Sequence, residues 1–495
     1  MLGVFSDGDL ARVRTLAKAN SNRCMVSKRK ARYDASLRTV VRMLAITACL
    51  AKLGAELDTH ITNLKTTKEI AVHAQQAIQV LQQCFQVTLD AASAQNKLSD
   101  FLPKQAPTGR VVVVGAGKGA AAMAAELERV WPYPEVALSG LVITRYEHTC
   151  PTQYIEVVEA SHPVPDGAGE AAAKRILASV QGLQAEDLVI ALMSGGASAL
   201  LSLPCAGISL QDKRAVNKAL LHSGAPIEHM NAVRKHLSAI KGGRLAQAAA
   251  PAQVLTLAIS DVVGDDLSVI GSGPTVPDAT TFADVRRIID QYDIDLPPAV
   301  AAYLQAATVA DETPKTLPNS TAHLVVTPNQ ALLHTEAWAK AQGLNVLYLG
   351  DQISGESKEV AQVMAGIAKH IATQNLPIAK PALLLSGGET TVTVKNPHGK
   401  GGRNTAFLLA LANALQGQEG VYALAADTDG IDGSEDNAGA WLAPETWQLG
   451  KDLGLDAEQM LQQDLAYGYF EALHQLLVTG PTRTNINDVR ALLIV

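Results

Sequence analysis

Residues Leu188–Pro204 read LVIALMSGGASALLSLP, and residues Pro381–Val394 read PALLLSGGETTVTV. In both stretches an apolar run ends in Ser-Gly-Gly, with a short polar residue soon after. Two further apolar runs end in glycine-rich turns, VVVVGAGKGAAAMA at 111–124 and VYALAADTDGIDGSEDNAGA at 421–440. Apolar runs bounded by glycine are typical of buried parallel strands. Small residues beyond a strand let a ligand approach backbone N–H groups at the next helix start, so we expect a site for an anion.

Strands and helices alternate through the first half of the chain. The pattern predicts strands at 111–114, 137–144, 154–160, 188–193 and 253–259, and helices at 117–129, 167–180, 214–223, 227–238 and 242–249. This alternation predicts an α/β fold with a doubly wound parallel sheet, whose ligands bind outside the carboxyl ends of the strands.

A second α/β set follows the proline-containing segment DETPKTLPNS at 311–320. We expect strands at 323–327, 345–349, 382–385, 391–394 and 421–425, helices at 331–342, 357–373 and 404–415, and mostly helical sequence to the end. The prediction is two lobes, each a mainly parallel sheet flanked by helices, with the active site in the cleft between them. We place a Rossmann-like lobe at 67–315 and a smaller α/β lobe at 316–495.

Composition excludes several classes of protein. The 495 residues carry a net charge of −7, which argues against nucleic-acid binding, and 4% of them are aromatic. The five cysteines are scattered, which suits a reducing cytoplasm, and no apolar run approaches the ~18–20 residues that span a bilayer. We expect a cytoplasmic protein with no membrane or nucleic-acid partner, as a monomer or small homo-oligomer.

The first 66 residues differ from the rest, with 12 Lys and Arg against 5 Asp and Glu. An organelle transit peptide, a lipoprotein cleavage box at 46–49 and a poorly ordered extension are the three interpretations. We favour the extension.

Lys118 lies in GAGKG, between an expected strand and an expected helix. The glycines resemble a dinucleotide-binding fingerprint, but Ala120 stands at the third glycine position, and the spacing does not fit a Walker A loop. A cation at a helix N-terminus opposes the helix dipole, which favours an anion beside Lys118.

Other charged groups follow the strands and open the helices. Asn231, Arg234 and Lys235 share one helix face, which predicts either an anion site or a solvated surface. Asp261, Asp265 and Asp266 follow the strand at 253–259, and the turn from Asp427 to Asp432 has a similar make-up; Mg²⁺ or simple turn chemistry explains both groups. Arg403 precedes a long helix, where its guanidinium can bind carboxylate or phosphate oxygens.

Seven separated motifs together resemble one family: GAGKGAAAMA, SHPVPDGAG, MSGGASALL, NAVRKHLSAIKGGRLA, SDVVGDDLSVIGSGPT, LLSGGETTVTVKNPHGKGGRN and ADTDGIDGSEDNAGA. They resemble the glycerate kinases that yield 2-phosphoglycerate, whose C-terminal half carries a MOFRL domain, here at about 380–490. The resemblance runs from about residue 75 to the C-terminus. It implies phosphorylation of D-glycerate at its 2-hydroxyl, with ATP and Mg²⁺ as cofactors.

The resemblance also implies roles for individual residues. It places catalytic roles on Lys118, Arg403 and Asp429. Lys118 and Arg403 would neutralise the phosphoryl group or hold the glycerate carboxylate, and Asp429 would orient or deprotonate the hydroxyl or hold the metal. Candidate binding residues are Ser194, Gly195, Gly196, Ser198, Asn231, Arg234, Lys235, Ser386, Gly387 and Gly388, and candidate metal ligands are Asp265 and Asp266.

Two alternative functions remain. One is an NAD(P)H-dependent hydroxypyruvate reductase, against which the incomplete fingerprint around Lys118 argues. The other is a non-catalytic sensor of sugar acids or nucleotides whose basic N-terminal segment contacts nucleic acid.

Overall fold

The computed structural model describes residues 74–495, which form one unit by their contacts. The extension predicted at 1–66 lies outside the described residues. Within the described part of the chain, no helix is both long and apolar enough to cross a membrane.

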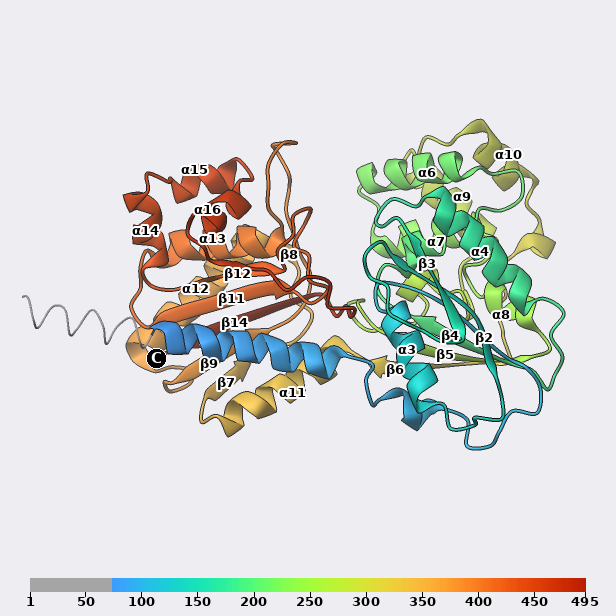
Figure 1. The fold of residues 1–495 in the computed structure, drawn as a ribbon. Helices are drawn as coiled ribbons and strands as arrows, with labels where there is room; N and C mark the ends of the chain where they lie inside the picture. Colours follow the sequence, from blue (N-terminus) through green and yellow to red (C-terminus); the bar gives the residue numbers. More distant parts are fainter. Residues whose placement is uncertain (1–73) are drawn as a thin grey trace, which may run out of the picture. The chain divides into compact units, whose positions relative to one another are not determined.

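The first sheet has six strands in the order β3-β2-β1-β4-β5-β6, and all its pairings are parallel (Figure 1). The strands are β1 (Val111–Ala116), β2 (Leu138–Arg145), β3 (Ile155–Ala160), β4 (Leu188–Met193), β5 (Gln253–Ile259) and β6 (Ser320–Val326). The strand order reverses between β1 and β4, and doubly wound sheets bind ligands at such a reversal. The α/β class predicted from the alternating pattern is confirmed.

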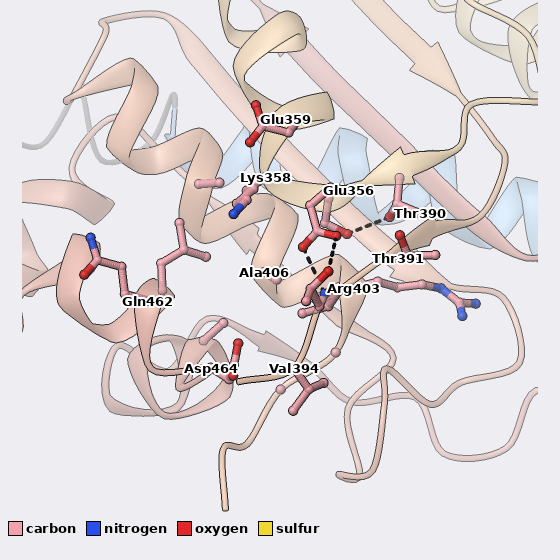
Figure 2. A pocket seen from close by; sticks show the side chains of 18 of the residues that line it. Glu356, Lys358, Glu359, Thr390, Thr391, Val394, Arg403, Ala406, Gln462 and Asp464 are labelled. Atoms are coloured by element: carbon pink, nitrogen blue, oxygen red, sulfur yellow. Dashed lines mark hydrogen bonds between the residues drawn. The ribbon is translucent and has the colours of Figure 1, made fainter. Parts of the chain in front are cut away.

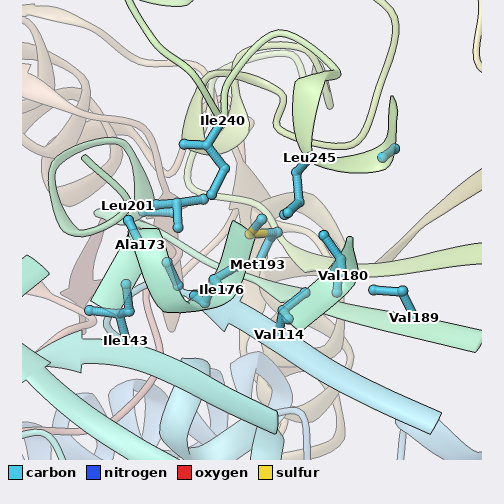
Figure 3. Packing of buried hydrophobic residues seen from close by; sticks show 14 of the residues in the cluster. Val114, Ile143, Ala173, Ile176, Val180, Val189, Met193, Leu201, Ile240 and Leu245 are labelled. Carbon is cyan, nitrogen blue, oxygen red and sulfur yellow. The ribbon is translucent and has the colours of Figure 1, made fainter. Parts of the chain in front are cut away.

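Helices cover both faces of this sheet. They are α3 (Ala120–Val130), α4 (Gly167–Val180), α5 (Ala197–Leu200), α6 (Leu210–His222), α7 (Ile227–His236), α8 (Arg244–Ala249), α9 (Phe282–Gln291) and α10 (Pro298–Ala306), with 3₁₀ turns η1 (Leu98–Phe101), η2 (Ile270–Ser272) and η3 (Val309–Asp311). Val112 and Val114 pack on the face that α4 and α8 cover, whereas Val111 and Val113 pack on the face that α3 covers. Figure 3 shows the first face, where Val114 and Met193 of the strands meet Ile176 of α4. Because both faces are buried, β1 is apolar along its whole length.

The second sheet also has six strands, in the order β13-β12-β11-β14-β9-β7. They are β7 (Asn345–Tyr348), β9 (Ala382–Ser386), β11 (Val421–Asp427), β12 (Gly439–Leu442), β13 (Leu476–Leu477) and β14 (Asp488–Ile494). The prediction of a mainly parallel second sheet was wrong, because in it only β7 and β9 pair in parallel. β14 inserts antiparallel between β11 and β9, and the connection from β11 to β12 is too short for a crossover.

The remaining elements are β8 (Gly355–Glu356), which pairs with β10 (Thr390–Thr391), and the helices α11 (Pro328–Ala341), α12 (Ser357–Gln374), α13 (Arg403–Leu415), α14 (Thr446–Asp452), α15 (Ala457–Gln462) and α16 (Ala466–Ala472). The strand predicted at 391–394 is thus only the two-residue β10.

Three further predictions also differ from the structure. The strand expected to open the second lobe, at 323–327, is β6, which pairs with β5 in the first sheet. The chain end, expected to be mostly helical, contributes β12, β13 and β14 to the second sheet. The helical residues 74–92 (blue in Figure 1) bury Leu81 and Phe85 in a cluster with Leu383 and Leu424 of the second sheet, although we had assigned them to the first lobe.

Candidate functional site

Lys118 lies in the turn that joins β1 to α3, beside the reversal of strand order. Its backbone N–H donates to the Gly195 carbonyl at 2.8 Å, and the N–H of Gly119 donates to Ser194 Oγ at 2.9 Å. The turns after β1 and β4 therefore hold each other directly. Only 12% of the Lys118 side chain is exposed.

The Lys118 ammonium forms an ion pair with the carboxylate of Asp429, which follows β11 of the second sheet. The other oxygen of Asp429 accepts the Ile431 N–H at 2.8 Å, and the Asp429 N–H donates to Asp427 at 3.0 Å. This ion pair brings two predicted catalytic residues together from turns 311 residues apart.

Arg403 binds three carboxylates at the start of α13. Its Nε lies 2.7 Å from Asp488, Nη2 lies 2.6 Å from Asp427, and Nη1 lies 2.8 Å from Glu389. Asp488 also accepts from Arg490, which is fully buried. Asp427 connects Arg403 to the turn that carries Asp429, so all three predicted catalytic residues belong to one charged network.

Carboxylates outnumber cations in this network, and this excess of negative charge shifts the pKa values of its members. Burial tends to lower the pKa of Lys118, but Asp429, Asp427 and Asp261 outweigh burial and raise it. Burial raises the pKa of Asp429, but the charge and hydrogen bond of Lys118 lower it below the ordinary value. Burial and the charge of Asp429 raise the pKa of Asp427 well above the ordinary value, although Arg403 opposes them. The network holds negative charge that its own cations do not balance.

Asp261, the second residue after β5, adds a further carboxylate. Its Oδ2 accepts from the Asn485 amide at 3.1 Å, and its carbonyl accepts from the Asn487 amide at 2.6 Å. Burial raises the pKa of Asp261 to about 6. The segment before β14 thereby contacts the loop that follows β5.

The predicted residues after β4 lie beside Lys118. A Cβ on Gly195 would overlap the Asn485 amide and the Asp261 carboxylate, so this position has room only for glycine. Gly196 has φ +82° and packs against the ring of His162, 3.1 Å from where its Cβ would stand. Burial, with the charges of Lys118 and Arg145, lowers the pKa of His162 to about 3. The ring therefore faces the site as a neutral group.

The other predicted residues have different surroundings. Lys235 is buried and paired with Asp278 at 3.3 Å, and Arg234 contacts only the amides of Asn217 and Asn231, each at 3.3 Å. Ser198 Oγ lies 2.8 Å from Ser272 Oγ. In the second sheet Ser386 is buried with no partner for its hydroxyl, the Gly387 carbonyl accepts from Arg490, and the Gly388 carbonyl accepts from the Asp488 N–H.

The structure does not bring the predicted metal ligands Asp265 and Asp266 to Lys118. Asp266 is exposed and its carboxylate accepts the Ser268 N–H, as in ordinary turn chemistry. Asp265 is half-buried with φ +58°, and neither residue makes an ion pair with Lys118 or Arg403.

Sequence reasoning missed three members of the network, Glu389, Asp488 and Arg490, and noted Asp261 and Asp427 at strand exits without choosing them as site residues. Asp427 is the last residue of β11 and Asp261 is the second residue after β5, so the rule that located Ser194 after β4 also points to both of them. Asp488 and Arg490 lie within β14, and no local signal distinguishes them.

A cavity of about 960 Å³ borders Arg403 and Glu389 within the second lobe. Its walls come from the starts of α12 and α13, from α15, and from the loop after β10 (Figure 2). Apolar side chains such as Val394 and Ala406 alternate with polar ones such as Gln462. The mixed lining and the size are typical of a site for an organic ligand.

Three backbone N–H groups that a dinucleotide pyrophosphate would need already have partners. Those of Lys118, Gly119 and Ala120 donate to Gly195, Ser194 and Gly117 respectively. In a dinucleotide-binding turn the pyrophosphate lies on the start of this helix. The β1–α3 turn is therefore ill suited to NAD(P)H.

The fold and the site define a two-sheet α/β protein with a charged network linking turns of both sheets. Comparison with protein families gives two matches, a domain of unknown function (DUF4147) at residues 80–305 and the MOFRL family at residues 382–488. The "D-glycerate 2-kinase" of Thermotoga maritima is 38% identical, over 82% of this chain and 96% of that protein. The chain belongs to the MOFRL family of class II glycerate kinases.

Other relatives agree on the fold but differ in name. The crystal structure of a glycerate kinase from Thermotoga maritima matches with a TM-score of 0.76 and 38% identity, covering 84% of this chain and 99% of that one. A protein of Agrobacterium vitis named "Putative hydroxypyruvate reductase" is 52% identical over 84% of this chain and 94% of its own length. The family is thus shared by proteins carrying both names.

Proposed function

We propose that this protein transfers the γ-phosphoryl group of ATP to the 2-hydroxyl of D-glycerate, giving 2-phosphoglycerate and ADP. The observation that carries the proposal is the network of Lys118, Asp429, Asp427 and Arg403. Phosphoryl transfer depends mainly on positioning and on neutralising charge, which such a network supplies. Relatives named as D-glycerate 2-kinase support the same substrate.

Each residue has a distinct task in the proposed reaction. Lys118 neutralises charge on the transferring phosphoryl group, and Arg403 fixes the carboxylates around it. Asp429 is held ionised by Lys118, so it accepts a hydrogen bond from the 2-hydroxyl and orients its oxygen for attack. As the new P–O bond forms, the bond to ADP breaks and the hydroxyl proton leaves to Asp429 or solvent. The N–H- and hydroxyl-bearing turn from Ser194 to Ser198 holds substrate oxygens.

Mg²⁺ fits the donor chemistry of Asp427 and Asp261. Asp427 is buried and Asp261 is half-buried, and both carboxylates have raised pKa values, so their negative charge is incompletely balanced. Within the described residues no three His, Cys, Asp or Glu side chains group as a metal site, but Mg²⁺ often binds one or two carboxylates together with substrate phosphates. When bound, the ion would shield the phosphates, and we propose these aspartates in place of Asp265 and Asp266.

The cavity beside Arg403 offers room for the nucleoside part of ATP. Arg403 in the wall of the cavity pairs with Asp427, and Asp427 accepts a hydrogen bond from the N–H of Asp429. Asp429 in turn pairs with Lys118 from the other lobe. Val394 lines the cavity with 66% of its surface exposed, so Val394→Trp should narrow the cavity without disturbing the core. We expect this variant to raise KM for ATP and leave KM for D-glycerate unchanged.

The test of the proposed reaction is ³¹P NMR of the protein with ATP, Mg²⁺ and D-glycerate. We expect the resonance of 2-phosphoglycerate, and 3-phosphoglycerate would keep the kinase but refute the position of transfer. Oxidation of NADH or NADPH with hydroxypyruvate, measured by absorbance in parallel, tests the alternative activity. Intact ATP together with oxidised nicotinamide would refute the kinase and establish the reductase.

A further inference from the structure

Three cations of the first lobe, two of them buried and one half-buried, have no acidic partner among residues 74–495. Lys213 of α6 is 3% exposed and Lys241, just before α8, is 1% exposed, while Arg234 of α7 is half-buried. Among the described residues, no Asp or Glu oxygen lies within the 4 Å of an ion pair from any of the three. Glu170 is the carboxylate whose charge raises the pKa of Lys213, but Glu170 itself forms an ion pair with Lys174 at 2.9 Å.

The contacts of these cations are with neutral groups or with none. Lys241 Nζ donates to the Gly271 carbonyl at 3.0 Å, and Arg234 donates to two amide oxygens. Lys213 Nζ is buried and has no hydrogen-bond partner within the part of the chain that the structure describes. A buried ammonium without a partner is among the most costly arrangements in a folded protein, because it has lost its hydration.

The cations also oppose one another. Burial, together with the charge of Arg234, lowers the pKa of Lys213 to about 8, although Cys205 and Glu170 act to raise it. Burial and the charges of Lys213 and Arg234 lower the pKa of Lys241 well below the ordinary value. By contrast, Lys235 on the same helix as Arg234 is buried but has Asp278 as its partner. The fold thus compensates one buried lysine and leaves three neighbouring cations uncompensated.

This cluster belongs to the loops that end the parallel strands. Lys241 contacts η2, which follows β5, and Ser272 of η2 contacts Ser198 of α5, which follows β4. The same β4 turn receives the Lys118 N–H through Gly195. Carboxyl ends of parallel strands are where doubly wound folds bind ligands.

We propose that Lys213, Arg234 and Lys241 form a binding site for an oxyanion of one of the two reactants, either the carboxylate of the hydroxy acid or a phosphate of the nucleotide. The assignment to a reactant rests on the proposed function, whereas the anion site itself does not. A bound anion would supply the negative charge that no carboxylate of the described residues provides near these three side chains.

The test compares Lys213→Met with Lys218→Met, which removes an exposed lysine from the same helix α6. Binding of inorganic phosphate to the full-length protein is measured by calorimetry, and KM is measured for D-glycerate and for ATP. We expect Lys213→Met to weaken phosphate binding and to raise one of the two KM values at least about tenfold, with Lys218→Met unchanged. A raised KM for D-glycerate assigns the carboxylate, and a raised KM for ATP assigns a nucleotide phosphate.

Stability without ligand separates a binding role from a packing role. Because Lys213 is an unpaired buried charge, Lys213→Met should unfold at the same temperature as the wild type or higher. A lower unfolding temperature with unchanged phosphate affinity would overturn the proposal. If Lys213→Met does not fold, Lys241→Met carries the same measurements.

The failure of this inference is distinguishable from failure of the proposed function. A wild-type protein that binds phosphate in a Lys213-dependent way but transfers no phosphoryl group keeps the anion site and loses the kinase. An active kinase whose phosphate affinity and both KM values are untouched in Lys213→Met keeps the function and refutes the anion site.

Discussion

Replacing Lys118 tests whether the ion pair with Asp429 serves both stability and turnover. The two side chains are 12% and 3% exposed, so Lys118→Met leaves Asp429 buried with only the Ile431 N–H as partner. Breaking a buried pair from one side costs about 3–5 kcal/mol, and we expect about 3 kcal/mol because Lys118 keeps some solvent contact. Asp429→Asn should cost less, about 1–2 kcal/mol, since Asp427 and Asp261 still balance the ammonium.

The double variant Lys118→Met/Asp429→Asn separates the two roles. Because both charges are removed, we expect the double variant to be destabilised by at least about 1.5 kcal/mol less than the sum of the two single destabilisations. Turnover should not recover, because phosphoryl neutralisation is lost with the lysine, and kcat should fall by about 10²–10³. Urea unfolding and a coupled assay for ADP measure the two effects. Additive stability effects within about 0.5 kcal/mol would refute the energetic pairing, and near-wild-type kcat in Lys118→Met would refute its catalytic role.

Three further substitutions test individual parts of the network. Gly195→Ala places a Cβ against Asn485 and Asp261, so we expect at least about a tenfold loss of kcat/KM, whereas Gly167→Ala, where a Cβ meets nothing within 4 Å, should behave as wild type. Arg403→Lys cannot reach three carboxylates at once, so kcat should fall by about 10²-fold, and retained turnover would show that charge alone suffices. Asp261 has a folded-state pKa raised to about 6, above its unfolded value, so its ionisation opposes folding and its contribution to stability should fall as pH rises from about 4 to about 7. Asp261→Asn should remove that dependence and raise the free energy of unfolding by about 1–2 kcal/mol at pH 8, a modest figure because the residue keeps some solvent contact. If the free energies of unfolding of both proteins change in parallel between pH 4 and 8, this prediction is contradicted.

The sequence predicts the first lobe well because each of its elements is marked locally. The strands β4 and β5 and the helix α4 have the predicted bounds to the residue. Buried parallel strands are apolar throughout and end in glycine or short polar residues, so both their extent and their exit are visible. The same exits locate Lys118 and Ser194, which the structure joins through Gly119 and Gly195.

The second sheet was predicted less well because its pairing depends on distant partners. β14 carries Asp488 and Arg490, and two charged residues in seven do not indicate a central strand. The structure buries both by pairing them with each other and by giving Asp488 a second partner in Arg403, 85 residues away. Such compensation is invisible in a single sequence, which is why the antiparallel arrangement and the carboxylates of Asp488 and Glu389 were missed.

The distribution of charge between the two sheets supports a division of labour in the proposed reaction. The first lobe supplies Lys118, Asp261 and the cations Lys213, Arg234 and Lys241, which have no acidic partner among the described residues, whereas the second lobe supplies Asp427 and Asp429 with Arg403 held among carboxylates. Phosphoryl transfer between two anionic reactants requires positive charge to hold them and carboxylates to orient a hydroxyl and a divalent cation. Neither set is balanced alone: burial lowers the pKa of Lys213 and Lys241 and raises that of Asp427. An anion on the first set and a cation on the second would relieve both, so the two reactants and Mg²⁺ complete the electrostatics that the polypeptide leaves open.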